Sequence, residues 1–124
     1  MKFLVVDDSP IDRLLLTRAL AKAFPDAVLC AVGSSMQEFE AAIEKERCDL
    51  AVIDYSLGWA DGFEVIRSVR QRWPNCWTIL MTVMPSEILF FHARTAGFDV
   101  CLTKSSSLQH LTIAVEGMLA DSEI

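Results

Sequence analysis

Five short apolar runs alternate along the chain with longer stretches that have the spacing of amphipathic helices. The runs cover residues 3–6, 27–32, 50–53, 77–81 and 100–102. Strands that are apolar throughout, joined by helices, are typical of a parallel sheet that is buried on both faces. With right-handed crossovers, the pattern predicts an α/β three-layer sandwich that has a five-stranded parallel sheet and five helices.

The stretches between the runs carry helix signals of their own. Ser9 is a good N-cap, Pro10 suits the first turn of a helix, and Pro25 ends that helix. Ser35 and Glu38 form a candidate capping box for the second helix. The remaining helices are expected over residues 62–73, 86–97 and 108–119.

Polar side chains stand where four of the five runs end. Asp7 and Asp8 follow the first run, Asp54 the third and Thr82 the fourth, and Lys104 lies just beyond the fifth. Because sites form at the carboxyl ends of parallel strands, these side chains are expected at one edge of the sheet. Three close carboxylates repel one another unless a cation joins them, and all-oxygen ligands favour Mg²⁺ or Mn²⁺ over zinc. A hydroxyl and an ammonium beside them suit an incoming phosphoryl group.

Each of these residues also has an ordinary structural interpretation. An acidic pair at a strand end is often a turn or a helix cap, and a single aspartate there is usually a capping residue. A lone lysine is most often a solvated surface residue. The expected placement of one group per strand at the same edge favours a site over coincidence.

Composition limits the alternatives. A length of 124 residues fits one domain, residues 1–124, without room for a second domain of ordinary size. The net charge of −6 argues against direct nucleic-acid binding, which needs a basic patch. No apolar run reaches membrane-spanning length and no signal peptide is evident, so a cytoplasmic protein without membrane contact is predicted.

The four cysteines show no C-x-x-C pair and no clustering with the two histidines, so neither a metal site nor a redox site is expected from them. Cys30 and Cys101 lie in apolar runs and are expected to behave as small buried hydrophobes.

Five short segments, in order along the chain, resemble the receiver domain of bacterial response regulators. They are Val5–Asp8, Val52–Asp54, Asp61–Glu64, Met81–Thr82 and Thr103–Lys104. The resemblance covers essentially the whole chain. It implies a flavodoxin-like fold with strand order 2-1-3-4-5.

The resemblance also implies a metal site and a reaction. Asp8 would bind Mg²⁺ directly and Asp7 through water, with Asp54 and the Ser56 backbone carbonyl as further ligands. Asp54 would take a phosphoryl group from the phosphohistidine of a sensor histidine kinase or phosphotransfer protein. Two further residues, Thr82 and Lys104, would contact the phosphoryl oxygens. Slow autodephosphorylation would follow at the same site, so the protein would be a signalling module and not an enzyme.

The resemblance implies a change in partner binding as the output. The partner would be a downstream protein or a tethered effector domain, met through the face formed by the fourth helix, the fifth strand and the fifth helix. The resemblance is also compatible with a homodimer. The chain is expected to be either a stand-alone regulator or the N-terminal part of a longer protein.

Four residues depart from the family pattern. Ser105 replaces the usual proline after Lys104, Cys101 takes the place of the switch aromatic, and Gly58 replaces a proline after the phosphorylation site. Val83, which follows Thr82, is larger than the small residue that is usual at this position in the family. We therefore expect a trans path at Ser105, a looser loop at Gly58 and restricted access at Val83. Phosphoryl transfer is predicted to be intact and signal readout to be atypical.

Other functions fit less well. A haloacid-dehalogenase-like phosphatase would carry D-x-D after the first strand and a cap domain, and a flavodoxin-like cofactor binder would carry a Gly/Ser/Thr-rich loop there. A pseudo-receiver is disfavoured because all five site residues are present. Phe90 and Phe91, like Trp59 and Trp73, are open to either a core or a partner-surface role. The two histidines are expected at the surface.

Overall fold

The structure, a computed structural model, describes residues 1–45, 47–104 and 108–122. Within these residues, five strands alternate with five helices. The strands are β1 (Lys2–Val6), β2 (Val28–Val32), β3 (Leu50–Asp54), β4 (Trp77–Thr82) and β5 (Val100–Thr103). The helices are α1 (Pro10–Ala23), α2 (Met36–Lys45), α3 (Gly62–Arg72), α4 (Glu87–Ala96) and α5 (Leu108–Ser122).

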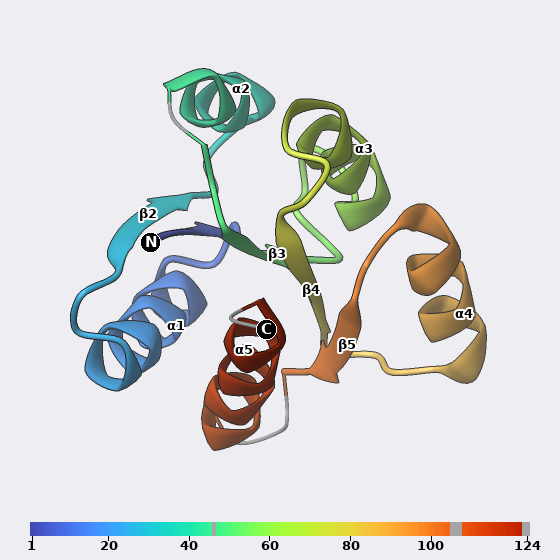
Figure 1. The fold of residues 1–124 in the computed structure, drawn as a ribbon. Coiled ribbons are helices and arrows are strands. Elements are labelled where there is room, and N and C mark those ends of the chain that lie inside the picture. The colour runs from blue at the N-terminus through green and yellow to red at the C-terminus, as the bar shows by residue number, and fades with distance from the viewer. Residues whose placement is uncertain (46, 105–107, 123–124) are drawn as a thin grey trace.

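The strands form one parallel sheet in the order β2-β1-β3-β4-β5, which confirms the predicted topology. Helices α2, α3 and α4 cover one face of the sheet, and α1 and α5 cover the other (Figure 1). Successive side chains of a strand point to opposite faces. Thus Leu4 and Val6 of β1 join the core under α2 and α3, whereas Phe3 and Val5 join the core under α1 and α5.

The helix ends follow local sequence. The Ser9 hydroxyl accepts a hydrogen bond from the Asp12 N–H at 3.3 Å, and Ser86 caps α4 by accepting from the Leu89 N–H at 3.0 Å. Gly97 closes α4 with a φ of 116°, a left-handed conformation that favours glycine. These termini agree with the sequence prediction.

The predicted capping box of α2 is only half formed. The Ser35 hydroxyl accepts from the Glu38 N–H at 3.1 Å, as a capping box requires. The Glu38 carboxylate, however, accepts from the Gly33 N–H at 2.8 Å, and this hydrogen bond lowers the pKa of Glu38 despite opposition from desolvation. Glu38 therefore fixes the connection between β2 and α2 in addition to the helix end.

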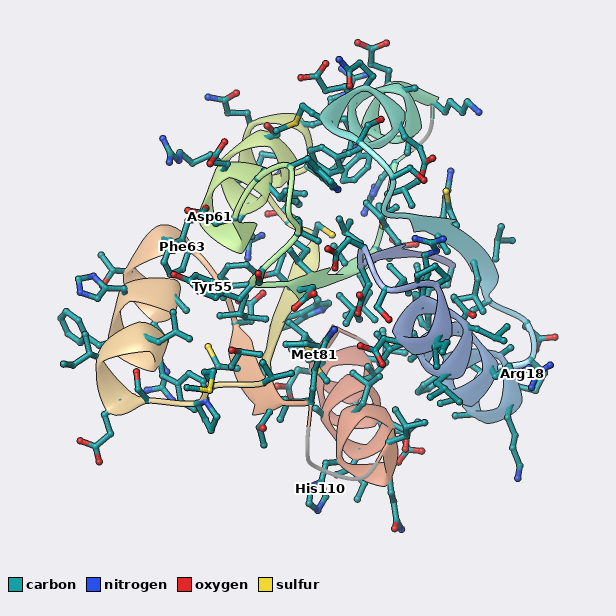
Figure 2. All side chains as sticks on the ribbon, turned by 180° about the vertical axis from the view of Figure 1, so that it is seen from behind. Arg18, Tyr55, Asp61, Phe63, Met81 and His110 are labelled. Atoms are coloured by element: carbon teal, nitrogen blue, oxygen red, sulfur yellow. The ribbon has the colours of Figure 1, made fainter. Side chains whose placement is uncertain are left out.

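The aromatic residues left open by the sequence separate into two groups. Trp73 is buried, and half-buried Trp59 donates its indole N–H to the Gly33 carbonyl at 2.9 Å, so both have structural contacts. On α4, Phe90 is half-buried and Phe91 is 69 % exposed. His110 points outward from α5 (Figure 2), and both histidines are exposed.

The cysteine prediction needs a correction. Cys30 and Cys101 are only half-buried, because β2 and β5 are the edge strands of the sheet. The buried cysteines among the described residues are Cys48 and Cys76. In the same part of the chain, no helix has the length and apolar character needed to span a membrane.

Candidate functional site

The carboxyl ends of β1 and β3 bring three carboxylates together. These strands are neighbours, and Val6 pairs with Ile53, so the residues that follow each of them, Asp7 and Asp54, stand at the same level. One carboxylate oxygen from each of Asp7, Asp8 and Asp54 lies within 4.8 Å of the others. Asp7 and Asp54 are buried and Asp8 is exposed. The predicted acidic cluster is therefore formed.

Lys104 supplies positive charge to this cluster. It follows β5, and its ammonium lies 2.8 Å from Asp7 Oδ2 and 3.2 Å from Asp54 Oδ2. The same ammonium lies 2.9 Å from Asp12 Oδ2, a contact that the sequence did not predict. Burial alone would lower the pKa of Lys104, but the hydrogen bonds with Asp7 and Asp12 outweigh it and raise the pKa. The lysine is therefore charged throughout the physiological pH range.

The buried position of Asp54 changes its acidity. Burial, together with the charge of Asp7, raises the pKa of Asp54 to about 6, although Lys104 and a hydrogen bond from the Ser56 backbone oppose this change. A second positive charge beside the carboxylates would favour the ionised form of Asp54.

Thr82, the last residue of β4, stands at the same edge. Asp54 pairs in register with Met81, so Thr82 is one residue further along the adjacent strand. Its hydroxyl accepts from the Met84 N–H at 3.1 Å, and its carbonyl accepts from the Lys104 N–H at 2.7 Å. Thr82 thus connects the strand end to the loop that leads into α4.

The predicted role of Ser56, in the loop after β3, stays a prediction. The Ser56 backbone acts to lower the pKa of Asp54, and its carbonyl is the group predicted to bind the metal. The Leu57 N–H donates to the Ala60 carbonyl at 3.1 Å, and between them Gly58 has a φ of 76°. Proline fixes φ near −65°, so the family's proline does not fit this backbone path. Greater looseness of the loop stays a prediction.

Gly33 is a second residue that the sequence analysis missed. It follows β2, and a Cβ atom there would lie 1.8 Å from the Asp7 carbonyl oxygen and 2.3 Å from Arg13 Nη1. That nitrogen donates to the same Asp7 carbonyl at 2.8 Å. The signal for Gly33 was a glycine directly after a strand next to the site. The signal for Asp12 was an acidic residue in the first turn of the helix that starts there.

The departures from the family pattern are partly described. Cys101 is half-buried against the core, and burial raises the pKa of its thiol. Val83 is exposed beyond Thr82. Ser105 lies outside the described residues. Atypical readout and restricted access therefore stay predictions.

The donor set suits a hard divalent cation. Its atoms are carboxylate oxygens that lie close enough together to share one ion, and exposed Asp8 leaves the cluster open to solvent. On the neighbouring surface, Tyr55 and Phe63 pack edge to face with ring centroids 5.5 Å apart and stabilise the start of α3 (Figure 2).

Comparison with known proteins gives a consistent result. The family model for the response regulator receiver domain matches residues 3–116. The chain is 31 % identical over 122 residues to the transcriptional regulatory protein TrcR of Mycobacterium tuberculosis, a match that covers 98 % of this chain and 46 % of TrcR. The chain spans about half the length of the curated transcriptional regulators that it matches.

Two solved structures share the fold. A CheY-like receiver domain protein from Methanospirillum hungatei has a TM-score of 0.86 at 23 % identity, over 98 % of this chain and 95 % of that one. A response regulator from Burkholderia pseudomallei, solved with a phosphorylated aspartic acid, calcium ion and citrate, has a TM-score of 0.79 at 19 % identity, over 99 % of this chain and 75 % of that one. With most of its length matched by the family model, the chain belongs to the response regulator receiver domain family of two-component systems.

Proposed function

We propose that residues 1–124 act as one receiver domain that accepts a phosphoryl group on Asp54. The observation that carries the proposal is the position of the Lys104 ammonium, 3.2 Å from Asp54 Oδ2 within the three-carboxylate cluster. A buried carboxylate beside a positive charge supports this proposal, because transfer of an anionic group requires both a nucleophile and charge stabilisation.

In the proposed reaction, an Asp54 carboxylate oxygen attacks the phosphorus of a phosphohistidine. The P–N bond breaks, and Asp54 becomes an acyl phosphate. Lys104 pairs with one phosphoryl oxygen, and the Thr82 hydroxyl, which accepts from the Met84 N–H, donates to another. The protein promotes its own phosphorylation and a slow hydrolysis, and it converts no separate substrate.

Asp7, Asp8, Asp54 and the Ser56 carbonyl would hold the cation, which we propose to be Mg²⁺, with Mn²⁺ as a substitute. When bound, the cation would neutralise the negative charge that accumulates on the phosphoryl group. The protein residues have separate roles: Lys104 keeps Asp7 and Asp54 together, and burial limits the access of water to Asp54.

The phosphoryl donor would be a sensor histidine kinase or a phosphotransfer protein. The phosphorylated domain would in turn bind a downstream protein target or a tethered effector domain. The contact would form at the face of α4, β5 and α5, where Ile88 and Phe91 are exposed. We infer a cytoplasmic location, which suits the four free thiols.

The proposal can be tested by intact-mass spectrometry after incubation with acetyl phosphate, with and without Mg²⁺. We expect a Mg²⁺-dependent adduct of about 80 Da, the mass that one phosphoryl group adds. The adduct should be absent from Asp54→Asn and present in Asp26→Asn, a matched control at an exposed turn. Failure of the wild type to gain the adduct and to bind fluoroberyllate with Mg²⁺ would overturn the proposal.

A further inference from the structure

Cys48 and Cys76 lie together at the edge of the sheet opposite the acidic cluster. Cys48 comes shortly before β3, and Cys76 comes directly before β4, its hydrogen-bonded neighbour. Between them, the Trp77 N–H donates to the Asp49 carbonyl at 3.0 Å. Both side chains are buried in the same core cluster, and each changes the pKa of the other. The fold thus brings together two thiols that the sequence separates by a strand and a helix.

The position of the pair suits a disulfide. Adjacent strands lie about 4.8 Å apart, and two positions offset by one residue across them fall within the Cα separation of about 4.4–6.8 Å that disulfides span. Cys48 and Cys76 lie two residues and one residue before Leu50 and Trp77, the first pair in register between β3 and β4. A covalent bond between the sulfurs would therefore join two segments that the paired strands already hold side by side.

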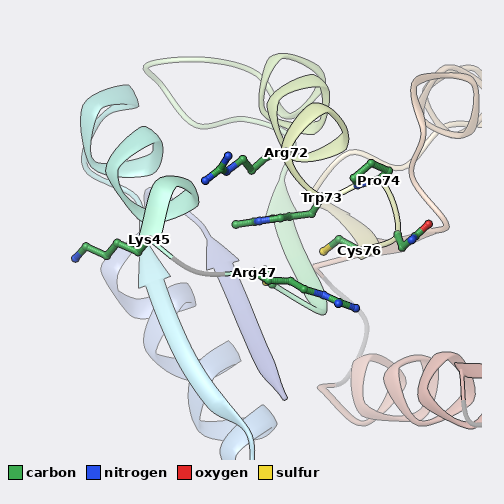
Figure 3. Close-up of a pocket in the computed structure, with 8 residues that line it drawn as sticks. Lys45, Arg47, Arg72, Trp73, Pro74 and Cys76 are labelled. Carbon is green, nitrogen blue, oxygen red and sulfur yellow. The ribbon is translucent and has the colours of Figure 1, made fainter.

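Cys48 and Cys76 both line a cavity of about 390 Å³, which Figure 3 shows beside Cys76 and Trp73. The two side chains are only 2 % and 3 % exposed, so a large reagent cannot contact the sulfurs. The rest of the lining consists of Lys45, Arg47, Arg72, Trp73, Pro74 and Asn75. Three of these residues are basic, and positive charge near a thiol favours the reactive thiolate.

The two thiols differ in acidity. The hydrogen bond with Cys76 lowers the pKa of Cys48 against the effect of burial, with further help from the backbone of Leu50 and Leu4. The same hydrogen bond, together with burial, raises the pKa of Cys76. This difference assigns Cys48 as the thiol that reacts first and Cys76 as the thiol that resolves the product.

We propose that Cys48 and Cys76 form a redox-responsive pair that a hydroperoxide converts into a disulfide. With hydrogen peroxide, the Cys48 thiolate attacks one oxygen, the O–O bond breaks, and the departing oxygen leaves as water after it is protonated. The resulting sulfenic acid is attacked by the Cys76 sulfur, the S–O bond breaks, and a second water leaves. Two electrons pass from the two sulfurs to the peroxide, so two thiols and one peroxide give one disulfide and two waters.

The disulfide would join the amino ends of β3 and β4. Strand β3 carries Asp54 at its other end, so oxidation would act on the same strand as phosphorylation, from the opposite edge. The cross-link would close a loop of the chain that contains α3, and it would lower the conformational entropy of the unfolded state. We expect the oxidised protein to unfold at a temperature about 5–10 °C higher than the reduced protein.

The test is intact-mass spectrometry of the reduced protein after exposure to hydrogen peroxide, followed by alkylation and digestion without reductant. We expect a loss of about 2 Da, which corresponds to two hydrogens, and a cross-linked peptide pair that contains Cys48 and Cys76. Reductant should restore the original mass. Asp54→Asn should behave like the wild type, which separates this outcome from the phosphorylation test.

Cys48→Ala and Cys76→Ala should each abolish the cross-link, whereas Cys30→Ala, at a half-buried position on β2, should not. Because a core substitution can impair folding, the wild-type measurement decides the proposal on its own. Oxidation of Cys48 to sulfinic or sulfonic acid without a cross-link would overturn it. A cross-link through Cys30 or Cys101, or no reaction of either buried thiol, would do the same.

Discussion

The ammonium of Lys104 lies 2.9 Å from the carboxylate of Asp12, a residue in the first turn of α1. This contact adds a third acidic partner to a lysine that also pairs with Asp7 and Asp54. The Asp12 side chain is 42 % exposed, so its ion pair is screened by solvent and contributes at most about 1 kcal/mol. Asp12 therefore competes with a phosphoryl oxygen for Lys104 without fixing the lysine permanently.

Replacement of Asp12 by asparagine tests this competition. We expect Asp12→Asn to be phosphorylated about 2- to 5-fold faster by acetyl phosphate, since a Lys104 contact of up to about 1 kcal/mol no longer has to be broken. Time courses of the mass adduct give the rate, with Asp26→Asn as the control. An unchanged or slower rate in Asp12→Asn would show that this ion pair does not limit the reaction.

The acidity of Asp54 predicts a dependence of stability on pH. Its pKa in the folded protein is about 6, above the ordinary value of 3.8, so the folded state binds the proton more tightly than the unfolded state. The stability that this proton supplies is present below about pH 4 and is lost as the pH rises to about 6. Lys104 does not titrate in this window, because its pKa is raised from a value that is already well above neutrality.

Asparagine at position 54 removes this titration. We expect Asp54→Asn to be more stable than the wild type by about 1–3 kcal/mol at pH 7.5 without divalent cations, and the gain to shrink towards pH 4. Urea unfolding at several pH values measures the difference. Mg²⁺ should reduce this difference in stability, because it stabilises the wild type with Asp54 ionised. A gain that is independent of pH would contradict the assigned acidity of Asp54.

Gly33 predicts a steric effect on the site. In Gly33→Ala the new methyl group would meet the Asp7 carbonyl oxygen at 1.8 Å, so the backbone has to move. We expect a loss of about 2–3 kcal/mol in the free energy of unfolding and weaker Mg²⁺ binding. Gly117→Ala is the matched control: nothing lies within 4 Å of its added atom, and alanine in a helix should add about 0.5–1 kcal/mol. Equal effects of the two substitutions would refute the steric argument.

The exposed apolar residues of α4 predict a partner surface. Phe91 and Ile88 lie exposed on the same helix, and we expect the fluoroberyllate-bound protein to self-associate through the α4–β5–α5 face. Phe91→Ala should weaken this association about tenfold or more, as truncation of an aromatic anchor does at many interfaces. Sedimentation velocity measures it. Ile11→Ala, at an equally exposed position on α1, is the control, and a similar effect there would argue against the α4 surface.

The fold could be predicted from the sequence because its signals are local. Each strand contains a short apolar run, and the carboxylates directly after β1 and at the end of β3 mark the edge where the site forms. Ser86 and Gly97, which cap the two ends of α4, are also recognisable from neighbouring residues alone. These features do not require knowledge of how distant segments meet.

The remaining features depend on contacts between distant segments. Asp12 meets Lys104 across 92 positions of sequence, and nothing near Asp12 distinguishes it from an ordinary acidic residue in a first helical turn. Cys48 and Cys76 meet only because β3 and β4 are neighbours. The hydroxyl of Thr82 accepts from Met84 because of the path of the following loop, which the strand pattern does not determine.

Gly33 also limits which sequences are compatible with this fold. Its N–H donates to Glu38, its carbonyl accepts from Trp59, and its α-carbon lies against the Asp7 carbonyl. Three connecting segments thus meet at one residue that has no side chain. In a library of random substitutions selected for folding, position 33 should retain glycine as strictly as the acidic residues of the site are retained under selection for signalling, although it takes no part in the chemistry.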